Sequence, residues 1–424
     1  MFKKTIRIVR KIIKWTLLSI VSLLLIIILL FSIPAVQTYV AQKAAAYLSK
    51  EMGTEVSIEK LRISWDFDII IEKIMLKDLH GHTLIAGSHG RCDFPKYNQL
   101  NRQLTISNIR VEDAEVFIAK YKGEDDINLR FFINYIKLKK RSERKIRISL
   151  QNIELRNGKF TFYNEPKLEK DKEGHWNYAN IVIDSIYSKI DELLIIHDSL
   201  NFKIRDLRGK ERSGFGIEQL KGKLRISNSG LYCFNTVLTT QESSQIHLDF
   251  GFKYNSYSDF SDFENNIIFD CKIHPSTLFL SDLGYFAPAL KGMKGVASVQ
   301  TTALYGPLVQ LSGKNIKIQF DKNNVFQGNI QLSGLPDIAS TRIKAAVHNL
   351  EITPSFVQAF VLPNDKQLQL PAIINRFQWV KVNGNFEGLY SNFIADADIK
   401  TDIGNGSFKE VSIELGKNTL SYKG

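Results

Sequence analysis

The fold is decided by the stretch RISLQNIELRNGKFTFYN (147–164), in which apolar residues recur at every second position over short runs. Ile146, Ile148 and Leu150 fall on one side of an extended chain, and Phe160 and Phe162 continue an apolar side further along. Successive side chains of a β-strand point to opposite faces of the sheet. This period of two therefore predicts strands with one apolar and one polar face.

A similar unit comes earlier in the chain, LTISNIRVEDAEVFIAKY (104–121), with Ile106 in its first strand. In both units a short strand meets Asn, and then an apolar pair, a tight turn and another strand follow. Asn157-Gly158 is the strongest hairpin signal in the chain. Looser units lie at 224–234, 296–313, 316–334 and 382–404. Irregular repeats of this size predict a mostly β fold, either an elongated, twisted antiparallel sheet or a β-solenoid, and not a compact sandwich.

An uncharged stretch near the N-terminus, WTLLSIVSLLLIIILLFSI (15–33), has the length of a transmembrane helix. Its nineteen residues span about 28 Å as an α-helix, close to the thickness of the hydrocarbon core of a bilayer. The stretch is longer than the apolar part of a signal peptide, and residues 32–35 match a cleavage site poorly. We therefore expect a retained membrane anchor that includes Trp15, Leu24, Ile28 and Ile33.

Basic residues, with no acidic residue among them, precede this anchor: Lys3, Lys4, Arg7, Arg10, Lys11 and Lys14. Such a cluster stays on the cytoplasmic side, so residues 1–14 are expected to form a cytoplasmic tail, with the rest of the chain across the membrane. These six residues supply half of the net charge of +12. The basic pI is thus weak evidence for a nucleic-acid partner, and we expect none.

Residues 34–53 predict a juxtamembrane helix, and Gly53 suits its C-terminal end. Its polar face holds few basic residues for lipid headgroups, so we expect it to plug the start of the next domain. Its expected apolar face consists of Val36, Val40, Ala44 and Tyr47 or Leu48.

From Thr54 the period changes to two, which predicts one β domain over 54–424. Where the alternation shifts by one residue, we expect a turn or a bulge. Short helices are predicted at 128–135, 276–291 and 354–362.

Alternation on this scale has a functional consequence, because the apolar face of a sheet must be covered. A long series of hairpins with few helices can close on itself, pair with another sheet, or curl into a trough that holds acyl chains. A sealed core remains the alternative to the trough. The residues predicted to line such a lipid groove are Ile106, Ile146, Ile148, Leu150, Phe160 and Phe162.

The order of elements resembles the AsmA-like superfamily, and most closely its TamB (translocation and assembly module) branch of the Bacteroidetes type. The resemblance rests on the anchor, the Ala-rich helix and TEVSIEKLRISWDFDIIIEKIMLKDLHGHTLIAG (54–87), and more loosely on 315–337 and 382–408. It implies a β-groove in the periplasm of a Gram-negative bacterium, held in the inner membrane, that carries phospholipid to the outer membrane.

The alternative implied by the same resemblance is an assembly factor for outer-membrane β-barrels or autotransporters, with an outer-membrane partner of the Omp85 or TamA-like type. TamB-like proteins usually run far longer than the 424 residues of this chain. This difference in length favours a truncated product or a smaller AsmA-like protein.

Enzymatic chemistry is not expected, because no catalytic motif and no defensible acid/base pair is present. We expect no cofactor and no metal. The spacing of His80, His82, His89 and Cys92 admits a zinc site, but a turn followed by a strand explains these residues better. The basic run 137–147 is either a solvated loop or a contact for lipid headgroups.

Overall fold

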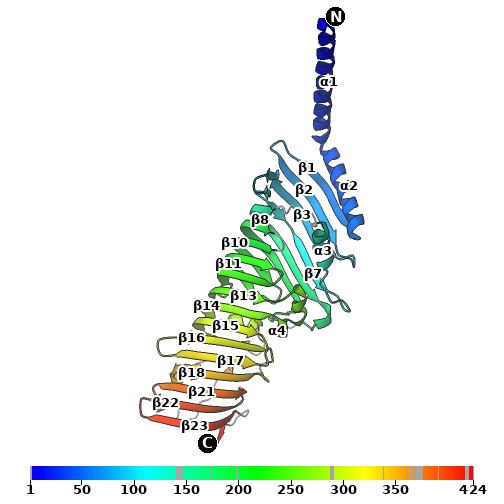
Figure 1. Ribbon diagram of the computed structural model, residues 1–424. Helices are drawn as coiled ribbons and strands as arrows, with labels where there is room; N and C mark the ends of the chain where they lie inside the picture. Colours follow the sequence, from blue (N-terminus) through cyan, green and yellow to red (C-terminus); the bar gives the residue numbers. More distant parts are fainter. Residues whose placement is uncertain are drawn as a thin grey trace.

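The computed structural model describes the chain except for residues 1, 140–146, 172, 197–198, 287–290, 338, 360, 363–365, 368–375, 390, 416–419 and 424. It is a mostly β protein, with 57% of residues in strands and 19% in helices, so the predicted fold class is confirmed at that level. Figure 1 shows the N-terminal helices at one end and the strands following one another toward the C-terminus.

Two helices open the chain, α1 (Phe2–Phe31) and α2 (Pro34–Met52). The part of α1 from Arg10 to Phe31 is long and apolar enough to cross a membrane, and none of it is buried against the protein. The predicted anchor ends at Ile33, whereas α1 ends at Phe31 and Ile33 adopts extended backbone as the N-cap of α2. Pro34 explains the difference, because proline disfavours helical backbone at the preceding residue and suits the first position of a helix.

The helix predicted at 34–53 is confirmed as α2, and Gly53 ends it in left-handed backbone at φ 70°. Its predicted apolar face is wrong, because Val40 and Tyr47 are 44% and 58% exposed. The buried positions are instead Gln37, Ala41 and Ala45. Small and polar residues form this face because α2 contacts backbone, not a layer of apolar side chains.

That backbone belongs to β1 (Val56–Ile63), the first strand of the sheet. Thr38 Oγ1 donates a hydrogen bond to the carbonyl of Leu61, and Gln42 Nε2 donates to the carbonyl of Glu59, each at 3.0 Å. An unpaired strand edge invites association with other chains. The side chains of α2 occupy this edge, as the expected plug would.

Among the described residues, one sheet holds twenty-two strands, and β19 and β20 form a separate two-stranded ribbon. The strands are β1 (Val56–Ile63), β2 (Asp68–Lys77), β3 (Thr83–Asp93), β4 (Lys96–Asn98), β5 (Gln103–Ile106), β6 (Arg110–Glu112), β7 (Glu115–Lys120), β8 (Arg147–Asn164), β9 (Asn180–Ile196), β10 (Ser199–Glu211), β11 (Gly216–Ser227), β12 (Gly230–Thr240), β13 (Gln245–Lys253), β14 (Ile268–Phe279), β15 (Val296–Pro307), β16 (Gln310–Gln319), β17 (Val325–Ser333), β18 (Arg342–Ile352), β19 (Val361–Leu362), β20 (Lys366–Gln367), β21 (Val380–Leu389), β22 (Asn392–Thr401), β23 (Asn405–Leu415) and β24 (Leu420–Lys423).

Most strands pair with their neighbours in chain order and antiparallel, from β1 to β3, from β8 to β18 and from β21 to β24. Strand β21 pairs directly with β18. The exception is the group β5, β6 and β7, which runs parallel to β8. Strands β6 and β7 also pair with β3, which joins the N-terminal strands to the rest of the sheet.

One-residue bulges keep the apolar side chains on one face of this sheet. In β12, Asn235 at φ 50° lies between Cys233 and Thr236, where the register with β13 shifts. A bulge residue drops out of the alternation, so the apolar residues on both sides keep the same orientation. The expectation that such shifts mark turns or bulges is thus confirmed. Other positive-φ residues at such shifts are Asn157, Ser185, Asn315 and Glu410. Lys73, Asn108, Asp113 and Asn152 also have positive φ where the apolar alternation shifts, but the register of the paired strands does not change there.

The predicted hairpin at Asn157-Gly158 is wrong. Strand β8 runs without interruption from Arg147 to Asn164, and Asn157 is a bulge residue within it, at φ 52°. A residue that tolerates positive φ serves a two-residue turn or a bulge equally well. The long partner strand β9 decides between them, because it pairs with β8 on both sides of the bulge.

The two similar sequence units lie side by side. Residues 103–120 pair in parallel with residues 147–164 at a constant offset, as in Ile106 with Leu150 and Ile118 with Phe162. The repeat in the sequence therefore appears as matched rows across neighbouring strands.

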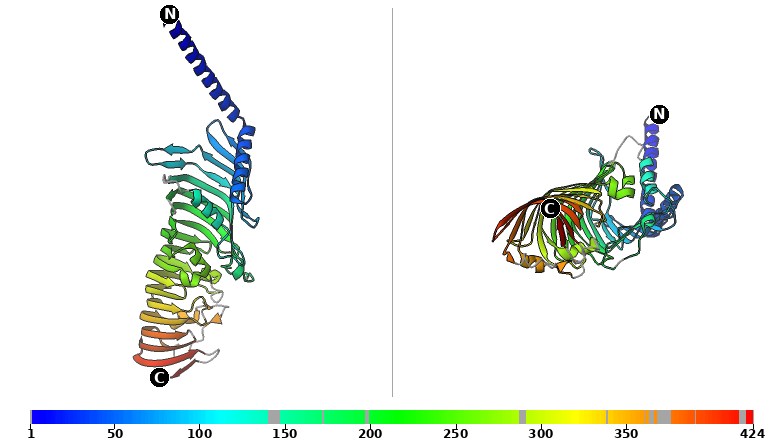
Figure 2. Two further views of the ribbon diagram at one scale, coloured as in Figure 1. Left: turned by 45° about the vertical axis from the view of Figure 1, so that its right-hand side comes forward. Right: turned by 90° about the horizontal axis from the view of Figure 1, so that it is seen from below.

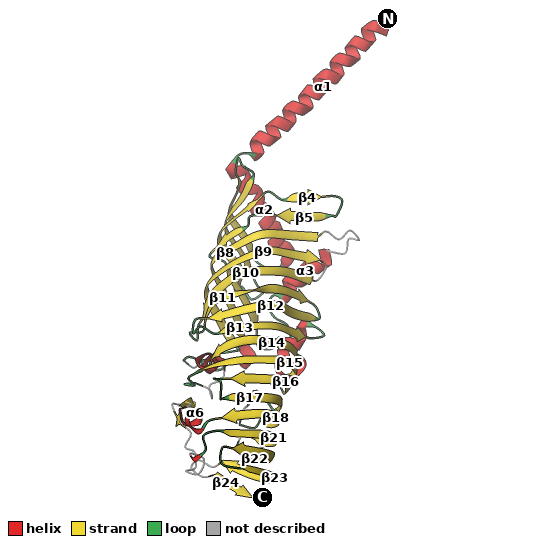
Figure 3. Cartoon of the chain, turned by 90° about the vertical axis from the view of Figure 1, so that its left-hand side faces the viewer, coloured by secondary structure: helices red, strands yellow, loops and turns green. Residues whose placement is uncertain are grey.

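Short helices lie beside the strand ladder (Figure 3). They are α3 (Arg130–Lys139), α4 (Phe263–Asn266), α5 (Leu283–Phe286), α6 (Pro354–Ala359) and the 3-10 helices η1 (Glu165–Lys167), η2 (Tyr257–Asp262) and η3 (Leu280–Asp282). The helix predicted at 128–135 starts and ends later, and the one at 354–362 gives way to β19. The prediction for 276–291 is wrong in its first part, because Ser276 and Leu278 pair with Val299 and Ala297 and extend β14.

Candidate functional site

A row of apolar residues crosses the sheet from strand to strand, and we call it the apolar stripe. Each member lies opposite the next in the strand register, and directly paired residues share one face of a sheet. The stripe spans roughly 67 Å at the usual spacing between strands. Its fifteen members are Ile106, Leu150, Leu193, Phe202, Leu224, Cys233, Phe250, Cys271, Leu304, Gly313, Ile330, Ala345, Phe386, Ala395 and Val411.

The residues next to the stripe along each strand point to the opposite face, which is mostly polar. Ion pairs join neighbouring strands there, as between Lys253 and Asp270 at 2.6 Å and between Arg342 and Glu387 at 2.8 Å. Exposed ion pairs of this kind contribute little stability, about 0–1 kcal/mol each. Their importance here is that one face of the sheet is suited to water and the other is not.

Five of the six residues predicted to line a groove lie on the apolar face. Ile106 and Leu150 belong to the stripe, and Ile148 lies opposite Ile195 in the adjacent row. Phe160 and Phe162 are brought to the same face by the left-handed residues Asn152 and Asn157, which shift the alternation of β8. The sixth, Ile146, lies outside the described residues.

Most of the stripe was not singled out from the sequence, including Phe202, Phe250, Leu304 and Phe386. The signal was nevertheless present, because each of these residues follows the same period of two, interrupted by an Asn, Gly or Ser where a bulge occurs. The sequence does not show which strands pair. That pairing places the apolar residues of separate strands in one row.

The apolar face is only half-buried. Leu193, Phe202, Leu224, Leu304 and Phe386 all keep intermediate exposure. Among the described residues, the only large apolar side chains below 2% exposure are Leu84 and Ile267. A sealed core of a sandwich or barrel would bury its large apolar residues far more completely.

Short helices cover part of this face. The ring of Phe263 in α4 lies 5.4 Å from that of Phe252 and 5.7 Å from that of Phe269, both in strands. Beside α6 the face is hollowed, with a volume of about 460 Å³, within the usual range for a ligand pocket. The hollow is lined mostly by apolar residues: Ile352, Pro354, Val357, Phe377, Val380, Ile399, Thr401, Ile403, Gly404, Asn405, Gly406 and Phe408.

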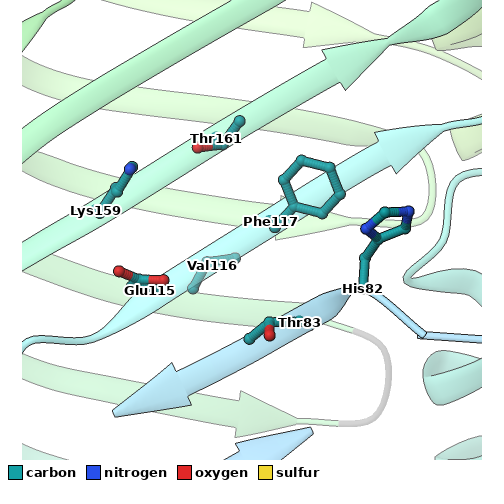
Figure 4. Close-up of a pocket in the computed structure, with 7 residues that line it drawn as sticks. All are labelled: His82, Thr83, Glu115, Val116, Phe117, Lys159 and Thr161. Atoms are coloured by element: carbon teal, nitrogen blue, oxygen red, sulfur yellow. The ribbon is translucent and has the colours of Figure 1, made fainter. Parts of the chain in front are cut away.

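A second, smaller hollow of about 250 Å³ lies near the N-terminal end of the sheet. Figure 4 shows side chains from β3, β7 and β8 around it. In the register Glu115 lies opposite Lys159, and Phe117 opposite Thr161, one residue away from the apolar row of Val116 and Phe160. This hollow therefore belongs largely to the polar face and is separate from the apolar stripe. The residues around it are His82, Thr83, Glu115, Val116, Phe117, Lys159 and Thr161.

The turn that precedes β3 is organised by Asp78, which is 1% exposed. One carboxylate oxygen accepts the backbone N–H groups of His80 and His82, each at 2.9 Å. The other accepts the hydroxyl of Tyr121 at 2.5 Å and the side-chain amide of Asn128 at 2.9 Å. Burial opposes ionisation of Asp78, but these hydrogen bonds outweigh it and hold its pKa below the usual value. This turn belongs to the stretch 54–87, on which the sequence resemblance rests.

The four residues considered for zinc do not form one site. His80 and His82 lie at the turn before β3, whereas Cys92 lies near the far end of that strand. Ten residues of strand separate His82 from Cys92 by roughly 33 Å. His80 instead contacts Glu124, with Nε2 3.0 Å from Oε1. Within the described ranges, no group of three or more His, Cys, Asp or Glu residues could hold a metal ion.

The anchor residues face away from the rest of the protein. Trp15, Leu24 and Ile28 are 53–66% exposed along α1, and Ile33 at the break is 45% exposed. Side chains this apolar and this exposed over a whole helix suit a lipid environment. All six basic residues of the predicted cytoplasmic tail belong to the same helix, before the apolar part. Most of the basic run 137–147 lies outside the described residues.

No family model, curated protein or solved structure matches the chain. The resemblance to the AsmA-like superfamily thus stays a prediction from the sequence.

Proposed function

We propose that this chain is an inner-membrane-anchored protein of the periplasm that carries phospholipid acyl chains along its apolar face, toward the outer membrane. The observation that carries the proposal is the apolar stripe, which continues through fifteen paired positions and keeps intermediate exposure at twelve of them. An apolar surface of this extent is stabilised when something removes it from water, by about 25 cal/mol per Å². Acyl chains have the chemistry to do so.

The stripe also has the properties needed for movement of a lipid. Apolar contact is non-directional, so an acyl chain that slides by one strand exchanges one set of contacts for an equivalent one. The polar headgroup can stay in water at the open side. In the end-on view of Figure 2 the strands curve around the long axis, which favours a groove over a flat surface.

The anchor completes the proposal, since one helix cannot itself form a transport pathway. Its expected role is to hold the start of the stripe against the membrane that supplies the lipid. In this proposal the protein is not an enzyme and uses no cofactor. Its partners are phospholipid, the inner membrane and an outer-membrane acceptor, for which a protein of the Omp85 or TamA-like type is the candidate.

Site-specific photo-crosslinking in the intact chain tests the proposal. A photo-reactive residue replaces Phe162, which faces the apolar side, or Thr161, its neighbour on the polar side. Phe386 and Glu387 form a second matched pair near the other end of the stripe. Lipid adducts at Phe162 and Phe386, with none at Thr161 and Glu387, are the expected result.

Two other outcomes would contradict transport. Adducts at position 162 without adducts at 386 would mean that lipid does not travel along the stripe. Protein adducts at the apolar positions in place of lipid would instead favour an assembly scaffold for outer-membrane proteins.

A further inference from the structure

The turn between β1 and β2 exposes two aromatic side chains. Trp65 is 95% exposed and Phe67 is 68% exposed. The turn is closed by backbone hydrogen bonds, from the N–H of Ser64 to the carbonyl of Asp68 at 2.9 Å and from the N–H of Phe67 to the carbonyl of Ser64 at 3.0 Å. Two large aromatic residues at a closed turn form an exposed apolar tip, which in soluble proteins usually marks a site of interaction.

The tip is tied to the end of the membrane helix by one buried side chain, Gln37, which is 7% exposed. Its Nε2 donates to the carbonyl of Phe31, the last residue of α1, at 2.7 Å. Its Oε1 accepts the N–H of Ile63, the last residue of β1, at 2.7 Å. Gln37 therefore links Phe31 to Ile63, which lies two residues before Trp65. Figure 1 shows the β1–β2 turn at the same end of the sheet as the junction of α1 and α2.

We propose that Trp65 and Phe67 insert into the headgroup region of the membrane that α1 spans. Tryptophan is enriched at membrane–water interfaces because its ring is apolar and its N–H can still contact water or headgroups. The tip and the anchor would then fix two points of the protein at the bilayer. Two points set the orientation of the sheet, whereas a single helix leaves it free to rotate.

The charges around the tip are compatible with this position. Asp66 and Asp68 flank the aromatic residues, and Arg91 pairs with both, its Nη2 lying 3.5 Å from Asp66 Oδ2. An arginine between two carboxylates reduces repulsion from anionic lipids. These charged groups allow the turn to lie at the surface of the bilayer but not within its apolar core.

The proposal rests on α1 as a membrane span and is independent of lipid transport. The full chain is reconstituted in vesicles of phosphatidylethanolamine and phosphatidylglycerol, with a photo-reactive phenylalanine analogue at position 65. The control carries the analogue in place of Tyr305, an exposed aromatic residue on the polar face of β15. We expect lipid adducts at position 65 and none at position 305.

Alkaline extraction separates the two ways in which this can fail. If the protein stays in the vesicles and position 65 gives no more lipid adduct than position 305, the tip does not contact the membrane and the proposal is overturned. Release of the protein would reject the anchor itself, and the proposal with it. Because the analogue is placed at an exposed turn, folding is not at risk, and the adducts at Phe162 report on transport separately.

Discussion

Asn152 donates a hydrogen bond from Nδ2 to Oδ1 of Asn108, 3.1 Å away and 44 residues earlier in the chain. Both residues have φ 50°, and they occupy equivalent positions in the two similar sequence units. Asn157 and Asp113, which also have positive φ, repeat the arrangement five residues further on, with Nδ2 2.6 Å from Oδ1. Residues in left-handed backbone thus align across neighbouring strands, which keeps the apolar residues of both strands on one face.

The first prediction concerns the left-handed backbone at Asn152. Asn152→Val should destabilise the protein by about 1–2 kcal/mol, because a β-branched residue is strained in left-handed backbone. Asn152→Gly keeps that backbone accessible and serves as the control, with a smaller effect. Urea denaturation followed by circular dichroism measures both. Equal stability of the two variants would show that left-handed backbone at position 152 is not required.

The second prediction concerns Gln37, the side chain between α1 and β1. Gln37→Ala removes the acceptor of the N–H of Ile63 in a partly buried place, at a cost of about 0.5–1.5 kcal/mol. Amide hydrogen exchange at Ile63 should become faster. Gln37→Glu keeps an oxygen for Ile63 but loses the donor to Phe31, so protection at Ile63 should largely return. If the alanine variant exchanges as slowly as the parent, the bridge does not hold the junction.

The third prediction concerns the pH dependence that arises from Tyr121. Burial and the neighbouring Asp78 carboxylate raise the pKa of the Tyr121 hydroxyl above its ordinary value. Above about pH 10 the unfolded chain loses this proton while the folded protein keeps it, so stability should fall as pH rises. Tyr121→Phe should be less stable at neutral pH, by about 1.5–3 kcal/mol. Its stability should also fall less steeply between pH 9 and pH 11, because one group fewer releases a proton on unfolding. The measurement is the urea midpoint against pH, and an unchanged slope in the variant would contradict the assignment.

The fourth prediction concerns Cys233 in the apolar stripe. Burial raises the pKa of its thiol to about 11, with a further contribution from Cys271. The thiolate is the reactive form, so alkylation at pH 8 should be about two orders of magnitude slower than for a free cysteine. The rate should keep rising up to about pH 11. Iodoacetamide labelling with mass spectrometry measures this, and the same reaction in urea provides the unfolded reference. Fast labelling of the folded protein at pH 8 would contradict it.

The fifth prediction concerns lipid transfer. Leu304→Glu places a carboxylate in the middle of the stripe, where an acyl chain would cover it without a partner. Transfer between donor and acceptor vesicles should fall at least about tenfold, since a cost above about 1.4 kcal/mol corresponds to that factor. Tyr305→Glu adds the same charge on the polar face, and its transfer rate should stay near that of the parent. Comparable losses in both variants would point to a general effect of charge or folding.

The sequence by itself determined the membrane-length helix, the break before Pro34, the end of α2 at Gly53 and the two-faced character of the strands. These features depend on neighbouring residues: continuous apolar length, the ring of proline, the freedom of glycine and the period of the side chains. Local chemistry of this kind is present in every short window of the chain.

Tertiary structure alone decided which strands pair, that Asn157-Gly158 is a bulge, and that Gln37, Ala41 and Ala45 form the buried face of α2. The physical reason is that each depends on a partner distant in the chain. Whether positive φ makes a turn or a bulge depends on whether the neighbouring strand continues beside it, here β9. A polar glutamine becomes a buried residue only where two backbone groups, at Phe31 and Ile63, come within reach of its amide. The apolar stripe is likewise a product of register, because each strand contributes only one of its residues.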